Sequence, residues 1–301
     1  MFLGIEIGGT KLQLAIGPGD GSRFATHERH DVNVRRGASG ILQQIENSSR
    51  SLIQNHPVRR IGIGFGGPVD SASGRIIKSH QIDGWEGLPL ASWATQTLGI
   101  PTVVGNDCDV AALAEAQFGS GRGKHTIFFV TVGTGVGGGL VIGGKLHGYG
   151  RPAVAEIGHL RPGLHADRPD ATVEALSSGW GIVATAQARN LDLPTAKNIT
   201  KAAMEGNQVA GEVLQGAFDA LGWAIAQVIT LIAPDVVVVG GGLSLMGHQR
   251  FFMPLRAAVA RYVFPPLENA YQIEPATLGE EVVVHGALAL AAASGATKKD
   301  D

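Results

Sequence analysis

Cysteine is the scarcest reactive residue in this 301-residue chain, which contains only Cys108. A single thiol excludes an intrachain disulfide framework and a zinc site built from several thiolates. Excess positive charge is also lacking, because 24 lysines and arginines stand against 26 aspartates and glutamates. A chain with a net charge of −2 has no field to hold a nucleic-acid backbone or an anionic membrane. We therefore expect neither nucleic acid nor a membrane as a partner.

Long apolar runs are missing too, since no window approaches eighteen uninterrupted apolar residues. The N-terminal MFLGIEIGGT carries no basic segment, so it predicts a first strand and not a signal peptide. Together with the single cysteine, these features predict a cytoplasmic location. A hydrophobic fraction of 44% is ample for a sizeable core in one or two domains.

Glycine is abundant, with 44 residues that cluster beside β-rich runs. Strand patterns at residues 2–7 and 11–16 alternate further along the chain with helical patterns at 38–55, 109–119 and 208–232. Residues 282–293 predict a last strand and helix. This alternation indicates an α/β protein. A polar break near residue 120 predicts two lobes, 1–119 and 120–283, with a C-terminal helix at 284–295 completing the first.

Two glycine turns each open one half of the chain. Gly133, Gly135 and Gly138 match the pattern G-x-G-x-x-G, but a strand and not a helix follows, which argues against a dinucleotide site. The turn with Thr134 can instead cradle phosphate oxygens with its N–H groups, or simply need positive φ. The turn after Glu6 leaves the same two interpretations open.

Polar residues follow the strands at two further places. Asn106 and Asp107 stand between a strand and a helix, where they are either helix caps or ligand-facing groups at a sheet edge. Glu156, His159 and Glu174 form either an ordinary hydrogen-bonded turn or part of a set that binds sugar hydroxyls.

Seven motifs occur in one order: IEIGGTK, GPVD, GNDCDVAALAE, GTGVGGGLVIGGKLHG, AEIGH, EALSSG and PDVVVVGGGLS. On these motifs the chain resembles the ROK family of bacterial sugar kinases and related repressors, in the actin/hexokinase-like superfamily. The resemblance implies a two-lobed α/β, ribonuclease H-like fold with an interlobe cleft. It implies phosphorylation by ATP and Mg²⁺ of a hexose or N-acyl/amino hexose, at the 6-hydroxyl in a glucokinase-like reaction. It also implies a homodimer or higher homo-oligomer.

The resemblance also assigns roles to residues. Asp107 would be the general base. The sugar would contact Gly66, Gly67, Asn106, Asp107, Glu156, His159 and Glu174. The nucleotide would lie against Gly8, Gly9, Thr10, Lys11, Gly133, Thr134, Gly135, Gly240, Gly241 and Gly242.

The chain departs from the family pattern in three ways. Glu6 stands where the family has an aspartate that orients Mg²⁺ through water. The cysteine-rich zinc motif is missing, so zinc is not expected, although His159, His165, Asp167 and Asp170 leave an N/O site open. The chain also starts at its first strand, without the helix-turn-helix of the repressors. We therefore expect a kinase, and the alternative is a non-catalytic sugar sensor or ROK-type regulator.

Overall fold

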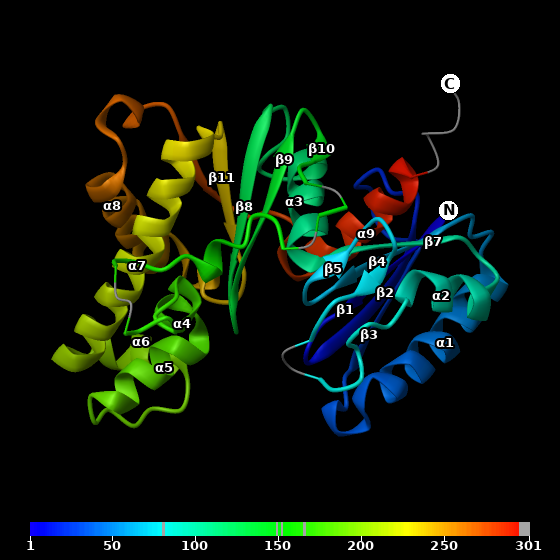
Figure 1. Cartoon of the computed structure of the whole chain (residues 1–301), viewed down its shortest axis with the longest axis horizontal. Coiled ribbons are helices and arrows are strands. Elements are labelled where there is room, and N and C mark those ends of the chain that lie inside the picture. The colour runs from blue at the N-terminus through cyan, green and yellow to red at the C-terminus, as the bar shows by residue number, and fades with distance from the viewer. Residues whose placement is uncertain (80–81, 149, 152, 165–166, 295–301) are drawn as a thin grey trace. The chain divides into compact units, whose positions relative to one another are not determined.

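The computed structural model describes residues 1–79, 82–148, 150–151, 153–164 and 167–294, in two compact units (Figure 1). Unit 1 comprises Met1–Gly123, Gly139–Val154 and Leu278–Asp301. Unit 2 comprises Lys124–Gly138 and Ala155–Thr277. The prediction from sequence placed residues 139–154 in the second lobe. They group with unit 1, where Gly139 lies close to α3: a Cβ on Gly139 would lie 2.6 Å from the Cys108 carbonyl oxygen.

Unit 1 is built on a sheet of order β3-β2-β1-β4-β7, in which β1, β4 and β7 run parallel. The β1–β2 and β2–β3 pairs are antiparallel, which confirms the predicted opening hairpin. The strands of the sheet are β1 (Phe2–Ile7), β2 (Lys11–Gly17), β3 (Thr26–Asp31), β4 (Ile61–Phe65) and β7 (Thr102–Asn106). The helices are α1 (Gly37–Asn55), α2 (Leu90–Leu98), α3 (Asp107–Phe118) and α9 (Val282–Ala293). A small separate ladder joins β5 (Val69–Asp70) to β6 (Arg75–Ile76).

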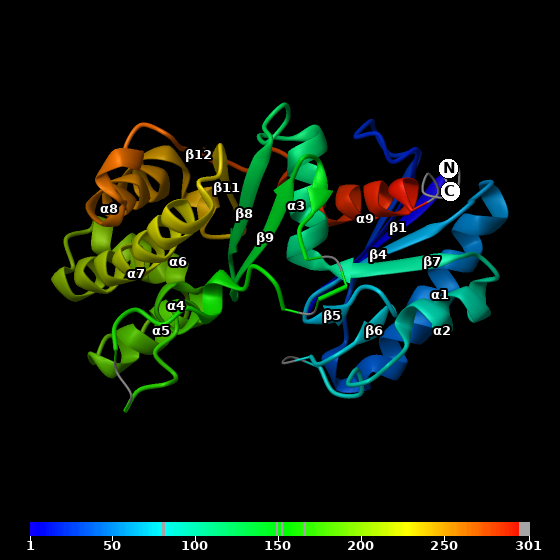
Figure 2. The ribbon, with the colours of Figure 1, turned by 45° about the horizontal axis from the view of Figure 1, so that its top comes forward.

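Helices cover the two faces of this sheet differently, as Figure 2 shows. Alternate strand residues such as Ile5 and Ile63 join the core that holds Ile41 and Ile45 of α1. On the other face, a Cβ on Gly62 would lie only 1.9 Å from the Ala287 carbonyl oxygen of α9. Glycine on this face therefore lets α9 lie directly on the strands.

One element of unit 1 differs from its prediction. The three valines that begin α9 suggested a strand, because β-branched residues favour strands. They are helical, and Val284 is fully buried beside Phe2 and Leu288. Packing against the glycine face of the sheet outweighs the local propensity.

Unit 2 contains most of the second sheet, whose order is β10-β9-β8-β11-β12. The β8–β11 and β11–β12 pairs are parallel, so the strand order matches that of the first sheet. The strands are β8 (Thr126–Val132), β9 (Val136–Ile142), β10 (Lys145–Leu146), β11 (Val236–Gly240) and β12 (Gln272–Pro275). The helices are α4 (Val173–Ser177), α5 (Gly179–Ala188), α6 (Ala196–Met204), α7 (Gln208–Ile232) and α8 (Met253–Tyr262).

The long helix α7 has the bounds that the sequence predicted. By length and composition it is the one helix in the described part of the chain that qualifies to cross a membrane. However, 56% of its most apolar 18-residue stretch is buried inside the structure. The helix packs there against α8 and α6 (Figure 1). It is thus the central helix of unit 2.

Candidate functional site

The carboxyl ends of β1, β4 and β7 meet at one edge of the unit 1 sheet. Ile7 pairs with Phe65 and Phe65 with Asn106, so the residues that follow these strands are neighbours. The Gly66 N–H donates to the Ile7 carbonyl at 2.9 Å. A Cβ on Gly66 would lie 3.4 Å from Asp107 Oδ2 and 3.8 Å from the Gly8 Cα. The fold therefore brings together three predicted site residues that are far apart in sequence.

The start of α3 separates the two interpretations of Asn106 and Asp107. Asn106 has extended backbone and is the N-cap, because its Oδ1 accepts from the N–H groups of Cys108 at 2.8 Å and Asp109 at 3.2 Å. Its Nδ2 donates to the Gly67 carbonyl at 2.9 Å, which holds the next glycine in place. Asp107 lies in the first helical turn, where the helix dipole favours a carboxylate. Its Oδ1 lies 2.8 Å from the Cys108 nitrogen, and its Oδ2 borders Gly66.

The hairpin turn after β1 carries Gly8, Gly9 and Thr10. Its Gly8 N–H donates to the Lys11 carbonyl at 2.9 Å. Neither glycine has the positive φ that the simple hairpin-turn interpretation requires. The hairpin itself is confirmed, but its turn does not use the left-handed conformation at either glycine.

The Glu6 carboxylate lies beside this turn, with its Oε1 3.9 Å from a Cβ placed on Gly8. Glu6 is buried, Lys11 Nζ lies 3.1 Å from Oε1, and Gln13 Nε2 donates to Oε2 at 2.5 Å. Burial raises the pKa of Glu6, and the Lys11 charge opposes that rise. Gln13 is not among the site residues predicted from the sequence. The signal for it was the alternation in KLQLAIG, which places Lys11 and Gln13 on one face of β2.

In unit 2 the carboxyl ends of β8 and β11 form a second glycine-rich edge. Gly240 pairs with Thr131, so the glycines after each strand are adjacent, and a Cβ on Gly133 would lie 3.6 Å from the Gly242 nitrogen. Gly241 has φ +87°, and a Cβ there would lie 2.5 Å from the Val132 carbonyl oxygen. Only glycine fits at that position. The structure thus brings the predicted residues of both segments together.

The turn at Gly133–Gly135 is closed by its own backbone and by a carboxylate. Its Gly133 N–H donates to the Gly135 carbonyl at 2.9 Å, and neither glycine has positive φ. The Val136 N–H donates to Glu174 Oε2 at 2.8 Å, and a Cβ on Gly135 would lie 2.5 Å from that oxygen. A Cβ at Gly135 would push the Glu174 carboxylate aside, and the interpretation that this turn needs positive φ is wrong.

Glu156 precedes a short 3-10 turn in unit 2, and His159 ends it. His159 Nδ1 lies 3.6 Å from Glu156 Oε2, and the imidazole is well exposed. The Val173 N–H donates to the Leu160 carbonyl at 2.8 Å, which ties this turn to α4 and so to Glu174. Adjacent segments of unit 2 therefore carry these three residues, as a shared sugar-binding role requires.

The predicted N/O metal site and the predicted magnesium site involve different residues. Across the described ranges, no group of three or more His, Cys, Asp and Glu side chains is placed to hold a metal ion, and His165 lies outside those ranges. At the edge of the unit 1 sheet, Glu6 and Asp107 supply carboxylate oxygens, which suit Mg²⁺. Both oxygens of Glu6 already face nitrogen donors. These residues fit a magnesium ion held through water rather than one bound directly.

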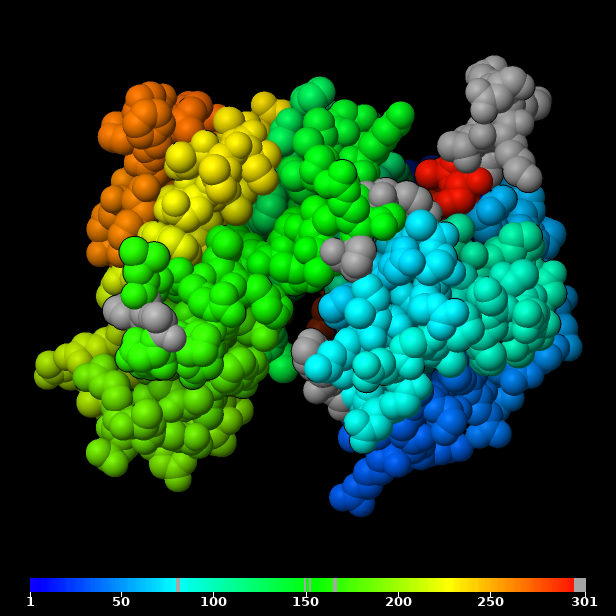
Figure 3. Space-filling view, viewed as in Figure 1, coloured from blue at the N-terminus to red at the C-terminus, as the bar shows by residue number. Residues whose placement is uncertain are grey.

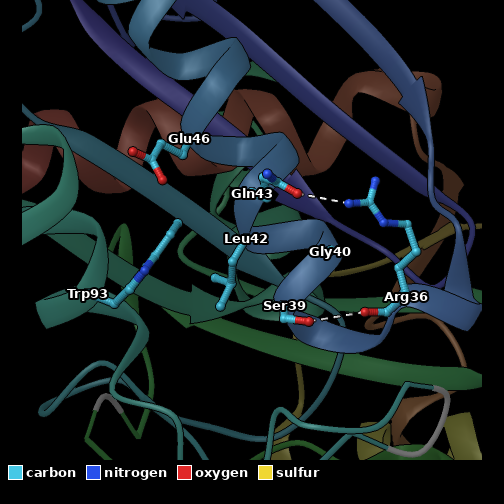
Figure 4. A pocket seen from close by; sticks show the side chains of 7 residues that line it. All are labelled: Arg36, Ser39, Gly40, Leu42, Gln43, Glu46 and Trp93. Atoms are coloured by element: carbon cyan, nitrogen blue, oxygen red, sulfur yellow. Dashed lines mark hydrogen bonds between the residues drawn. The ribbon is translucent and has the colours of Figure 1, made fainter.

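A surface hollow of unit 1 lies elsewhere, between α1 and α2, which are among the blue and teal segments of Figure 3. Its volume is about 570 Å³, and Trp93 and Leu42 contribute its apolar lining (Figure 4). Arg36 donates to Gln43 Oε1 at 2.8 Å, so part of its polar lining is already paired. It contains none of the predicted site residues.

Comparison with known proteins settles the family. The sequence profile described as "ROK family" matches residues 2–294. The chain belongs to the ROK family. This ROK protein is 28% identical over 313 residues to a glucokinase of Thermotoga maritima, covering 96% of each chain. It is 33% identical over 250 residues to an N-acetylmannosamine kinase of Escherichia coli O127:H6, covering 81% of this chain and 83% of the relative.

Solved structures agree with this assignment. A ROK family glucokinase from Streptomyces griseus, in complex with glucose and AMPPNP, superposes with a TM-score of 0.79 at 28% identity. The match covers 96% of this chain and 98% of that one. The predicted family and the predicted two-lobed α/β, actin/hexokinase-like fold are thereby confirmed. The interlobe cleft stays a prediction.

Proposed function

We propose that this ROK protein is an ATP-dependent sugar kinase that acts on a hexose or an N-acyl or amino hexose. The relatives named glucokinase and N-acetylmannosamine kinase support this substrate class. The observation that carries the proposal is the position of Asp107. Asn106 caps α3, while Asp107 Oδ2 borders Gly66 at the sheet edge, where Gly8 is also a neighbour of Gly66.

Asp107 is the proposed general base. As the sugar hydroxyl oxygen forms its bond to the γ-phosphorus of ATP, the bond from that phosphorus to the bridging oxygen breaks and ADP leaves. The hydroxyl proton passes to Asp107 Oδ2. Magnesium, when bound, supplies positive charge for the transferred group. Within unit 1, the Gly8 N–H already donates to the Lys11 carbonyl, so the Gly9 and Thr10 N–H groups are the ones proposed to meet phosphate oxygens.

Unit 2 supplies the proposed sugar and nucleotide contacts. Glu156, His159 and Glu174 offer two carboxylates and an imidazole, which pair with hydroxyl groups. In the turn at Gly133–Gly135, the Gly133 N–H donates to the Gly135 carbonyl, so the Thr134 and Gly135 N–H groups are the ones proposed to meet phosphate oxygens. The adjoining Gly240–Gly242 segment lies against the adenosine in this proposal, because it lacks the side chains that would block a flat ring.

The direct test is Asp107→Asn. This substitution keeps the shape of the side chain but removes its proton acceptor, so the rate of sugar-dependent ADP release should fall by about 10²–10⁴-fold. Asp109→Asn is the matched control, because it removes a carboxylate from the same helical turn. ATP binding and melting temperature should stay near the wild-type values in both variants. Wild-type activity in Asp107→Asn would show that Asp107 is not the base.

The contacts that Glu6 already makes favour an alternative function, which is sugar binding without catalysis. Because Lys11 and Gln13 already occupy its carboxylate, the chain would bind sugar without efficient transfer if those contacts persist during turnover. A non-catalytic sugar sensor or ROK-type regulator would show sugar-dependent thermal stabilisation and no ADP release. A coupled ADP assay over a sugar panel separates this alternative from the kinase.

Three finer points belong to the same proposal. We propose the 6-hydroxyl as the acceptor, a cytoplasmic location and a homodimer or higher homo-oligomer. Positional analysis of the phosphorylated product by NMR tests the first point. Light scattering of the purified protein tests the last.

A further inference from the structure

Gln13 is a buried amide in the middle of an apolar strand. It is 1% exposed, and its neighbours Leu12 and Leu14 belong to the core on the opposite face of β2. A buried amide is costly unless its donors and acceptor are satisfied. A leucine or methionine of similar volume would fill the same space without that requirement. The presence of an amide at this position therefore depends on the contacts that Gln13 makes.

All the polar atoms of Gln13 are engaged. Nε2 donates to Glu6 Oε2 at 2.5 Å and to the Glu280 main-chain carbonyl at 3.0 Å. His27 Nε2 lies 2.9 Å from Gln13 Oε1, so the imidazole donates to that oxygen. The opposite amide orientation would set Oε1 against a carboxylate and a carbonyl, which are both acceptors. The partners thus fix the amide in one orientation.

The contact with Glu6 connects Gln13 to the edge of the sheet. Glu6 Oε1 faces Lys11 Nζ at 3.1 Å and lies beside the Gly8 turn, while Oε2 is held by Gln13. Without Gln13, that oxygen would lose its donor inside the protein, and the carboxylate would be free to rotate away from the turn. A residue of β2 therefore fixes the position of the Glu6 carboxylate.

We propose that Gln13 is a positioning residue for phosphoryl transfer, which holds the Glu6 carboxylate in one orientation beside the glycine turn. This inference rests on the proposed kinase activity. Gln13 touches no reacting atom in this scheme. Its loss should lower kcat and leave the KM for sugar nearly unchanged, because the proposed sugar contacts lie on other residues.

The test compares Gln13→Leu and Gln13→Met with the wild type. Each substitution removes a hydrogen bond to a charged group, so kcat should fall by about tenfold or more, with the sugar KM within about twofold. Thr200→Val is the matched control, because it removes a buried hydrogen bond, from Thr200 to the Ala196 carbonyl, in α6 of unit 2. It should lower the melting temperature without lowering kcat.

A double-mutant cycle with Glu6→Gln separates positioning from stability. If Gln13 acts through the Glu6 charge, Gln13→Leu should change kcat by less than about twofold in the Glu6→Gln background. A purely structural role would give additive effects on log kcat, or a lower melting temperature with wild-type kcat, and either result would overturn the assignment. An inactive wild type would refute the kinase proposal and this inference together. If the wild type is active and the Gln13→Leu variant has the same kcat, this inference alone is refuted.

Discussion

Gly286 of α9 offers a quantitative test of how closely α9 packs in unit 1. Helices α3 and α9 cross there, and a Cβ on Gly286 would lie 1.8 Å from the Val110 carbonyl oxygen and 2.4 Å from the carbonyl carbon. Real Cβ contacts are essentially never shorter than 3.0 Å. Gly286→Ala therefore forces the helices apart by about 3.0 − 1.8 = 1.2 Å. The clash involves backbone, so no side chain can rotate to relieve it.

The expected cost is that of overpacking a core, about 1–3 kcal/mol. For a domain of this size, that cost lowers the melting temperature by roughly 2–12 °C. Val110 lies one turn after Asp107, so the shift also disturbs the start of α3 and should reduce kinase activity. Differential scanning calorimetry of the whole chain, together with the ADP assay, measures both effects.

Gly216→Ala in α7 is the matched control. It makes the same substitution in a helix, but its Cβ would have no atom within 4 Å. Alanine restricts the unfolded chain more than glycine does, so this variant should gain about 0.5–1 kcal/mol. A Gly286→Ala protein that melts at or above the wild-type temperature, beside a stabilised Gly216→Ala protein, would refute the packing argument.

Two further predictions concern the glycine turn of unit 2 and the stability of the fold at acidic pH. Gly135→Ala should raise the sugar KM by about tenfold in steady-state kinetics, because the new Cβ displaces Glu174 from its bond with the Val136 N–H. Burial lowers the pKa of His285 below 6.5, so the unfolded chain takes up its proton first as the pH falls. Stability should therefore fall below pH 6.5, and His285→Phe should weaken that dependence in melts between pH 5 and 7; an unchanged slope would contradict it.

Much of the candidate site could be predicted because strand ends are readable from sequence. Gly8, Gly66 and Asn106 each follow or end a strand, and parallel strands place such residues at one edge. The choice between Asn106 and Asp107 as cap could not be made, since both residue types cap helices well. The structure decides it, because Asn106 Oδ1 accepts from the Cys108 and Asp109 N–H groups, while its Nδ2 donates to Gly67, 39 positions away in the chain.

Long-range contacts account for the features that could not be predicted from the sequence. Gln13 looked like an ordinary strand residue until Glu280, 267 positions away, was seen to accept from its amide. The last helix was misjudged for the same reason, since its valines are helical only against the glycines of the sheet. Local propensity carries no information about such partners.

The contacts of Lys11 refine what the first glycine turn can contribute to phosphate binding. The resemblance placed Lys11 among the nucleotide-binding residues, where its charge would attract phosphate. The ammonium lies 3.1 Å from the Glu6 carboxylate and donates to the Glu280 carbonyl at 3.2 Å, so much of its field is cancelled locally. A phosphate at this turn would then meet backbone N–H groups and a neutral ion pair. Affinity for ATP should accordingly depend more on the shape of the turn at Gly8 and Gly9 than on the charge of Lys11.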